Sequence, residues 1–182
     1  MRFPVEAKLK DGTPIQLLLA GQKDVEALRQ LYQVIVAEGT SYPHDRMPDQ
    51  GEFMGYWFRG KTTVAAYPQD RASGAEMLGA FYLKPNWPGR ARQVANAGFI
   101  VAPDWRNKGL GWLLGATMLH YAKELGYRSV IFNLVFSENL AARHLWTKLG
   151  FSELASIPGA VRKNDRTYQD AIIMFKSLTE ER

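Results

Sequence analysis

The chain of 182 residues contains no cysteine. That absence excludes disulfides, thiolate metal ligands and cysteine nucleophiles. No run approaches the roughly 20 apolar residues that a membrane-spanning helix needs, and the amino-terminal MRFPVEAKLKDG lacks the apolar core of a signal peptide. Histidine is also scarce, with three scattered residues, so we expect no metal site. The sequence predicts a cytoplasmic protein with neither a membrane partner nor a metal.

Composition is otherwise ordinary, with 46% apolar, 12% aromatic and 23% charged residues. A chain of this length can bury a substantial core, and we expect one domain over residues 1–182. The net charge of +5 is compatible with nucleic acid, an anionic small ligand or a merely basic surface. Aromatic residues do not alternate with the basic stretches 88–92, 105–108 and 161–166 as on a base-stacking platform. We therefore expect no nucleic-acid partner, and an anionic cofactor suits the charge as well.

The hydrophobic pattern alternates between strands and helices. Apolar residues recur at three and four positions in segments typical of helices, and β-branched and aromatic runs are typical of strands. The predicted helices are 22–39, 52–58, 109–126 and 139–150. The predicted strands are 15–20, 62–67, 76–83, 93–103, 129–136, 151–157 and 168–178. This order predicts an α/β fold with a mixed sheet covered by helices on its faces.

The most informative junction is FIVAPDWRNKGLGWLLG, over residues 99–115. A strand ends at Pro103, a turn carries Arg106 and Lys108, and Gly109 and Gly111 then open a helix. Free N–H groups at a helix start, the positive end of its dipole and close backbone approach at glycine predict a pyrophosphate site. The spacing fits neither a P-loop nor a dinucleotide-binding fingerprint.

Arg-x-x-Gly-x-Gly between an extended segment and a long helix resembles the acyl-CoA signature of the GNAT N-acetyltransferases. The strand 129–136, Asn139 and AARHLWTKLGF (141–151) are similar to the second motif of that family, N-x-x-A-…-L-Y-x-K-x-G-F. The resemblance implies an acetyl-CoA-dependent N-acetyltransferase with the GNAT fold. In that fold a central mixed, mostly antiparallel sheet is splayed between two strands at the acetyl-CoA site, with helices on both faces.

The resemblance also implies the residues that hold the cofactor. The backbone of residues 99–101 would pair with the pantetheine arm like an added strand, and the backbone N–H groups of residues 106–111 would cradle the pyrophosphate. Asn139 would contact pantetheine, although capping the following helix explains this residue equally well. The implied cofactor residues are Phe99, Ile100, Val101, Arg106, Asn107, Lys108, Gly109, Leu110, Gly111 and Asn139.

Trp146 stands where many members of the family carry a tyrosine thought to protonate the leaving thiolate. An indole N–H is no usable acid. The thiol of CoA should resemble that of cysteine, with a pKa of about 8.5, so the thiolate can leave without full protonation if donors surround it. The missing tyrosine also motivates an alternative, a non-catalytic acyl-CoA sensor.

Asn133 lies within the apolar strand 129–136, where an unpaired buried amide costs roughly 1–3 kcal/mol. Together with Asn96, Asn139 and the segments 39–43 and 56–58, it resembles the yeast azetidine-2-carboxylate (proline-analogue) N-acetyltransferases. This narrower resemblance implies that Asn96 and Asn133 are catalytic and hold a small amino-acid substrate. Alternatively, Asn133 hydrogen-bonds backbone groups that are left without partners where two strands separate.

Acetyl transfer requires a neutral acceptor amine, and strand 93–101 carries no carboxylate that could serve as the base. The candidates are a water held by Asn96 or Asn133, or Tyr42, His44 or Asp45, and the sequence does not choose among them. We expect Tyr42 and His44 to bind the acceptor. The expected acceptor is a small-molecule amine such as a proline-like amino acid, with a protein or peptide amine as the alternative. The family also implies a homodimer.

Overall fold

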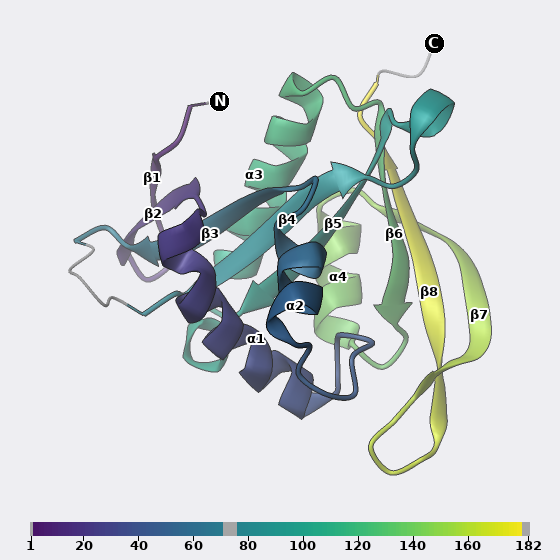
Figure 1. The fold of residues 1–182 in the computed structure, drawn as a ribbon. Helices are drawn as coiled ribbons and strands as arrows, with labels where there is room; N and C mark the ends of the chain where they lie inside the picture. The colour runs from purple at the N-terminus through teal and green to yellow at the C-terminus, as the bar shows by residue number, and fades with distance from the viewer. Residues whose placement is uncertain (1, 71–75, 180–182) are drawn as a thin grey trace.

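One eight-stranded sheet forms the centre of the protein, in the order β1-β2-β3-β4-β5-β6-β8-β7 (Figure 1). The computed structural model describes residues 2–70 and 76–179. All neighbouring strands are antiparallel except β5 and β6, which are parallel. The strands are β1 (Val5–Lys8), β2 (Pro14–Leu19), β3 (Thr62–Pro68), β4 (Gly79–Pro85), β5 (Val94–Val101), β6 (Ser129–Phe136), β7 (Ser152–Arg162) and β8 (Tyr168–Ser177).

Helices cover both faces of the sheet. Helices α1 (Val25–Glu38) and α2 (Gln50–Trp57) lie on one face, and α3 (Leu110–Glu124) and α4 (Leu140–Lys148) lie on the other (Figure 1). The described residues thus have the α/β architecture that the sequence predicted. No helix within residues 2–70 and 76–179 is long and apolar enough to cross a membrane.

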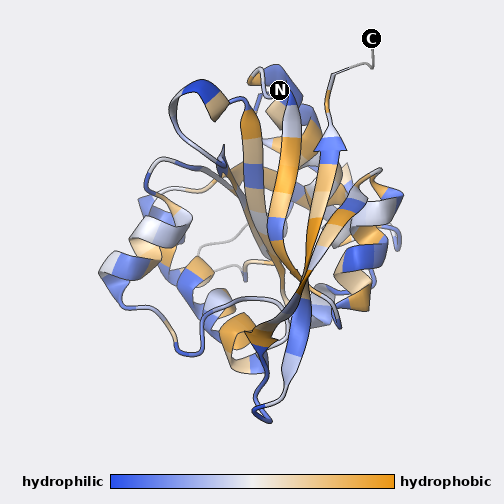
Figure 2. Cartoon of the chain, turned by 90° about the vertical axis from the view of Figure 1, so that its right-hand side faces the viewer, coloured by the Kyte–Doolittle hydropathy of each residue, from blue (hydrophilic) through white to orange (hydrophobic). Residues whose placement is uncertain are grey.

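Alternation along the strands divides the apolar side chains between two cores. Phe81 and Ala97 pack with α3 and α4, whereas Ala80 and Ile100 pack with α1 and α2. Figure 2 shows that hydrophobic residues follow the strands through the middle of the sheet, while the tip of the β7–β8 hairpin is hydrophilic. The two faces of β5 therefore lead to different helix layers.

The predicted splay lies between β5 and β6. These strands pair at Val94 with Ser129 and at Ala95 with Val130, and then separate. On its other side β6 has an irregularity between Phe132 and Val135 in its pairing with β8. Helix α3 forms the crossover that makes the two strands parallel. The sheet is consequently open at the carboxyl ends of its two central strands.

Several element boundaries differ from the prediction. Strand β1 was not predicted, because four residues alternating between half-buried and exposed give little signal. Strand β7 continues past the predicted residue 157 to Arg162, since an edge strand accommodates Pro158 where its pairing is irregular. Helix α2 begins earlier than predicted because Asp49 and Glu52 form a capping box. The turn predicted over 68–74 falls partly outside the described residues.

Candidate active site

A cavity of about 300 Å³ lies where β5 and β6 separate, and we call it the inner cavity. Strands β4, β5 and β6, the segment 41–43 and helix α4 contribute its walls. Its polar lining includes Lys84, Asn96, Asn133 and Asn139, which come from four different elements or their ends. No histidine or carboxylate side chain lines it within the described part of the chain. The sheet therefore brings Asn96, Asn133 and Asn139 together, as the sequence predicted.

Strand β5 presents a free backbone edge to this cavity. The carbonyl oxygen of Ile100 lies 2.7 Å from the position that a Cβ on Gly79 of β4 would occupy, so the backbone of Ile100 faces β4. Because backbone groups alternate sides along an antiparallel strand, Phe99 and Val101 face the splay. Phe99 and Val101 thus lie where the sequence placed them, and Ile100 instead belongs to the core, at 2% exposure.

Tyr42 secures this edge of β5. Its hydroxyl donates a 3.0 Å hydrogen bond to the carbonyl oxygen of Phe99. Burial, reinforced by neighbouring tyrosines, raises the pKa of Tyr42 well above its usual value, so the phenol stays protonated. Tyr42 lines the inner cavity as predicted, but its hydroxyl is a donor to the strand and is poorly suited to act as a base.

The two basic side chains of the predicted pyrophosphate turn, Arg106 and Lys108, already contact other residues of the protein. Arg106 Nη2 contacts both carboxylate oxygens of Glu38 at 2.9 and 2.8 Å, and its Nε lies 3.4 Å from the Val101 carbonyl. Lys108 Nζ lies 4.6 Å from the centre of the Trp105 ring. The backbone N–H groups at the start of α3 therefore remain as the main donors of this turn.

The two glycines of the turn have different structural roles. Gly109 has φ +90° and precedes α3, a conformation that side chains other than glycine rarely adopt, and Asn107 beside it has φ 63°. Gly111 has no such φ, but a Cβ there would lie 3.3 Å from Leu145 of α4. Gly109 thus shapes the turn, while Gly111 allows α3 and α4 to approach closely.

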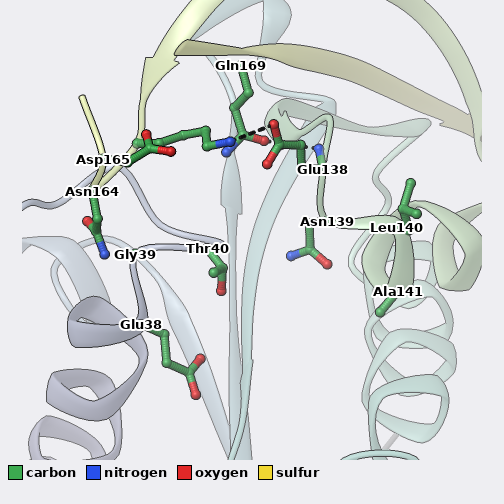
Figure 3. Close-up of a pocket in the computed structure, with 11 residues that line it drawn as sticks. Glu38, Gly39, Thr40, Glu138, Asn139, Leu140, Ala141, Asn164, Asp165 and Gln169 are labelled. Carbon is green, nitrogen blue, oxygen red and sulfur yellow. Dashed lines mark hydrogen bonds and ion pairs between the residues drawn. The ribbon is translucent and has the colours of Figure 1, made fainter. Parts of the chain in front are cut away.

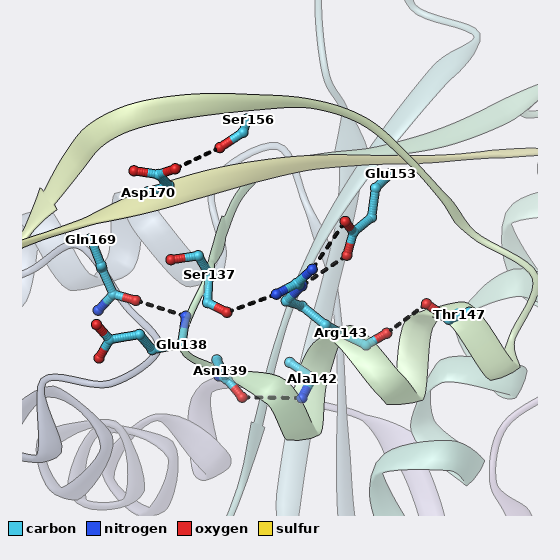
Figure 4. A network of polar contacts seen from close by, with 10 residues as sticks. All are labelled: Ser137, Glu138, Asn139, Ala142, Arg143, Thr147, Glu153, Ser156, Gln169 and Asp170. Atoms are coloured by element: carbon cyan, nitrogen blue, oxygen red, sulfur yellow. Dashed lines mark hydrogen bonds and ion pairs between the residues drawn. The ribbon is translucent and has the colours of Figure 1, made fainter.

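Asn139 caps helix α4. Its Oδ1 accepts a 3.0 Å hydrogen bond from the Ala142 backbone, as Figure 4 shows. Arg143 in the next turn bridges the carboxylate of Glu153 and the Ser137 carbonyl, which ties α4 to β7 and to the end of β6. Capping is therefore confirmed for Asn139, and its Nδ2 remains as a donor on a side chain that lines the inner cavity.

Asn133 is not buried, contrary to the expectation for a strand enclosed on both faces. It is exposed to the inner cavity, and its Nδ2 donates to Asn86 Oδ1 over 2.6 Å. Figure 1 shows the segment after β4 crossing in front of β6, which brings these residues together. Asn96, by contrast, is buried at 9% exposure and makes no side-chain hydrogen bond to any residue that the structure describes. Its amide is available to a ligand.

Trp146 fills the wall of the inner cavity that borders the α3–α4 core. Its ring centre lies 4.7 Å from those of both Phe99 and Phe132, and a Cβ on Gly115 would lie 3.1 Å from its ring. Trp146 is 6% exposed. The indole is thus a packing element at the place where the family motif has a phenol.

Lys84 and Tyr82 line the inner cavity but were not among the predicted site residues, and Tyr56 entered the sequence analysis only as part of the segment 56–58. Lys84 lies opposite Asn96 in the β4–β5 register, so the pairing of those strands would have revealed it. Tyr82 passes over Gly98, where an added Cβ would lie 2.6 Å from its ring. Burial raises the pKa of both tyrosines, which therefore remain neutral donors.

His44 lies outside the inner cavity. Its Nδ1 shares a 2.7 Å hydrogen bond with the Tyr32 hydroxyl, and burial lowers the pKa of His44. It lines a neighbouring groove of about 780 Å³, which we call the outer groove, together with Asp45. The outer groove shares Tyr42, Leu134 and other wall residues with the inner cavity, so the two spaces adjoin.

A third space, of about 540 Å³, lies between the carboxyl end of α1 and the amino end of α4 (Figure 3). Glu38, Thr40 and Asn139 face it, and the β7–β8 hairpin borders it through Lys163. Because Asn139 lines both this space and the inner cavity, the two form adjoining parts of one cleft.

Comparison with known proteins agrees with this geometry. A model of the acetyltransferase (GNAT) family matches residues 26–151, and the chain belongs to this family. It is therefore an N-acetyltransferase, and the interpretation as a non-catalytic sensor is not supported.

Individual relatives extend the match. The chain is 35% identical over 158 residues to the N-acetyltransferase aca1 of Schizosaccharomyces pombe, covering 78% of this chain and 76% of that protein. A GCN5-related N-acetyltransferase from Kribbella flavida is 28% identical with a TM-score of 0.82, over 90% of this chain and 97% of that one. A phosphinothricin acetyltransferase from Sinorhizobium meliloti, solved with acetyl-CoA, shares the fold with a TM-score of 0.80 at 20% identity, over 91% and 89% of the chains.

Proposed function

We propose that residues 1–182 form one domain that transfers the acetyl group of acetyl-CoA to the amine of a small molecule. The observation that carries the proposal is the inner cavity, where the free edge of β5 faces Asn133 across the splay. Backbone N–H groups of β5 that can bind a thioester and side-chain amides that can bind an amine therefore line the same cavity.

The residues present fit acetyl-CoA, which would supply the acetyl group as a thioester. The N–H groups of Phe99 and Val101 face the splay and can pair with an extended amide-bearing arm. Asn139 Nδ2 is a further donor at the start of α4. The Gly109 turn and the first N–H groups of α3 suit a pyrophosphate. Phe99 N–H is also the donor that we assign to the developing oxyanion.

On the acceptor side, Asn96 and Asn133 orient the amine. An asparagine amide offers one acceptor and two donors, so it can accept from the amine and hold a water or a carboxylate. Lys84 beside them places a positive charge in the cavity, which lowers the pKa of a bound ammonium group and favours the neutral nucleophile. Because no carboxylate or histidine lines the described inner cavity, we assign proton acceptance to a water held by Asn96.

A proline-like amino acid suits this environment. Its carboxylate would pair with Lys84, and its secondary amine would lie between the asparagines. The resemblance of Asn96, Asn133 and the 39–43 segment to azetidine-2-carboxylate N-acetyltransferases supports the same acceptor class. The outer groove favours a second candidate, the terminal amine of a peptide, because it continues the inner cavity by about 780 Å³.

The test is turnover of acetyl-CoA with proline, azetidine-2-carboxylate and a panel of primary amines, followed by release of free thiol and by mass spectrometry of the product. We expect N-acetylated product from the imino acids and its loss in Asn133→Ala. Unchanged turnover in a folded Asn133→Ala variant would contradict the assignment of that residue, and no product from any amine would contradict the proposal itself.

Two further expectations remain predictions. A homodimer is compatible with edge strand β7, which exposes Leu154 at 58% and Ile157 at 43%. The cytoplasmic location also stays a prediction of the sequence.

A further inference from the structure

The outer groove is strongly basic, and its cations differ in how they are neutralised. Arg46, Arg162, Lys163 and Arg166 line it, against the single carboxylate of Asp45. The groove lies between the segment after α1 and the β7–β8 hairpin, next to the inner cavity. An anion entering it would meet a net positive wall.

Two of these cations are fully committed to partners. Arg46 forms two 3.1 Å contacts with the two carboxylate oxygens of Glu52, and Lys163 Nζ lies 3.0 Å from Glu138 Oε1. Pairing of this quality leaves little charge for a ligand.

The other two retain spare charge. Arg162 Nη2 lies 3.5 Å from Asp45 Oδ2, a long contact between side chains that are 56% and 78% exposed. Arg166, at the tip of the hairpin, makes no ion pair with any residue in the described ranges. Guanidinium groups are suited to bidentate contact with carboxylates.

The space beside α4 has a different balance of charge from the outer groove. The space beside α4 is lined by Glu38, Glu138 and Asp165, with Lys163 as its cation (Figure 3). The two regions adjoin at Gly39, Lys163 and Asn164, which line both, and an added Cβ on Gly39 would be 2.7 Å from the Asn164 amide. Glu38 is held by Arg106 and Glu138 by Lys163, so Asp165 is the carboxylate of this space that has no ion pair among the described residues. A negative tail is therefore favoured in the outer groove, which holds unneutralised cations, over this space.

We propose that the acceptor extends from the inner cavity into the outer groove and carries there a carboxylate held by Arg162 and Arg166. This inference rests on the proposed function and refines its substrate class to amines with an anionic tail. The large volume of the groove indicates an acceptor longer than a single imino acid, such as an acidic dipeptide.

The test uses the full chain, acetyl-CoA and three dipeptides, Pro-Glu, Pro-Gln and Pro-Lys, each as its C-terminal amide. They share one terminal proline amine, carry no α-carboxylate and differ in the charge of the second side chain. We expect kcat/KM for Pro-Glu to exceed that for Pro-Gln by at least about tenfold, through KM, with Pro-Lys poorest. The preference should shrink as salt is raised, because the groove is exposed.

Variants locate the effect. Arg162→Gln and Arg166→Gln should each raise KM for Pro-Glu while leaving kinetics with Pro-Gln nearly unchanged. Arg46→Gln removes the same charge from the same groove but from a guanidinium already held by Glu52, and should keep the preference. If all three variants lost the preference for Pro-Glu equally, the overall positive potential of the groove would explain the preference, and the assignment to Arg162 and Arg166 would be overturned.

Further outcomes are also decisive. Equal kcat/KM for the three dipeptides, or turnover of free proline with none of the dipeptides, overturns the proposal. If no amine is acetylated, the proposed function fails, and calorimetric titration of the dipeptides with CoA present still tests the charge preference. Tighter binding of Pro-Glu that Arg166→Gln abolishes supports the anionic subsite, and equal binding overturns it.

Discussion

Asn133 Nδ2 donates to Asn86 Oδ1 across 2.6 Å, so an amide inside β6 is held by the residue that follows β4. Asn86 does not line the inner cavity, whereas Asn133 does. The contact fixes which part of the Asn133 amide faces the cavity, because Nδ2 is turned to Asn86 and Oδ1 is left to accept from an acceptor amine.

Asn86→Ala should therefore lower kcat by about two- to tenfold, the value of one hydrogen bond, with little change in stability. Asn86→Asp keeps the accepting oxygen and should retain most of the activity. The double variant Asn86→Ala with Asn133→Ala should be no worse than Asn133→Ala alone, as steady-state kinetics will show. Additive losses would mean that Asn86 acts independently of Asn133.

Gly109→Ala should weaken acetyl-CoA binding. Its φ of +90° costs another residue about 1–2 kcal/mol, and relief of that strain would reshape the pyrophosphate turn. Gly126→Ala is the matched control, because Gly126 has φ +82°, an added Cβ there meets open space, and the residue lies at the far end of α3. Both variants should lose similar thermal stability, and only Gly109→Ala should raise the dissociation constant in calorimetry. Equal acetyl-CoA affinities for the two variants would show that the Gly109 turn is not part of the cofactor site.

Tyr42→Phe should reduce stability by about 1–3 kcal/mol, because the Phe99 carbonyl loses its buried donor. The same change should lower kcat, since the β5 edge is less firmly held. The acid limb of the pH–kcat/KM profile should not move, because a phenol with a raised pKa is not the base. If the acid limb of the pH–kcat/KM profile were shifted or missing in Tyr42→Phe, Tyr42 would be identified as the base.

Trp146→Phe should keep activity within about threefold, because the indole N–H makes no hydrogen bond to the described residues and the ring serves packing. Trp146→Ala should instead cost about 3–5 kcal/mol of stability through the cavity that it creates. Urea denaturation and thiol-release assays measure the two effects. A folded Trp146→Phe enzyme with a large kcat defect would point to the indole as a participant in the chemistry.

Lys61 provides a test of pH dependence. Burial, with a contribution from the charge of Lys84, lowers the pKa of Lys61 to about 8. Between about pH 8 and its ordinary pKa near 10.4, the unfolded chain binds this proton while the folded chain has released it. The contribution of Lys61 to the free energy of unfolding should therefore rise with pH across that window.

The measurement is urea denaturation at pH 7.5 and pH 9.5 for the wild type and Lys61→Met. The wild type should gain stability relative to Lys61→Met as pH rises. Lys123→Met, at an exposed position, serves as the control and should follow the wild type. Parallel curves for wild type and Lys61→Met would show that the folded pKa of Lys61 is not lowered.

The sequence by itself determined the fold class and the order of elements. Apolar periodicity predicted the helices, and the glycine turn before α3 predicted a pyrophosphate site, because these signals are local. The splayed sheet was implied by the resemblance of the two motifs to the GNAT family. The two motifs also implied Asn139 and Phe99 as site residues, and the narrower resemblance to the azetidine-2-carboxylate N-acetyltransferases implied Asn96 and Asn133.

Tertiary structure decided everything that depends on side chains from distant segments. It turned Ile100 towards β4, exposed Asn133 and gave it Asn86 as a partner, and used the Tyr42 hydroxyl to hold the Phe99 carbonyl. It also brought Lys84 beside Asn96 and placed His44 in the outer groove. None of these could be predicted locally, since strand register, backbone alternation and the crossing of the segment after β4 are fixed only when the whole sheet is assembled.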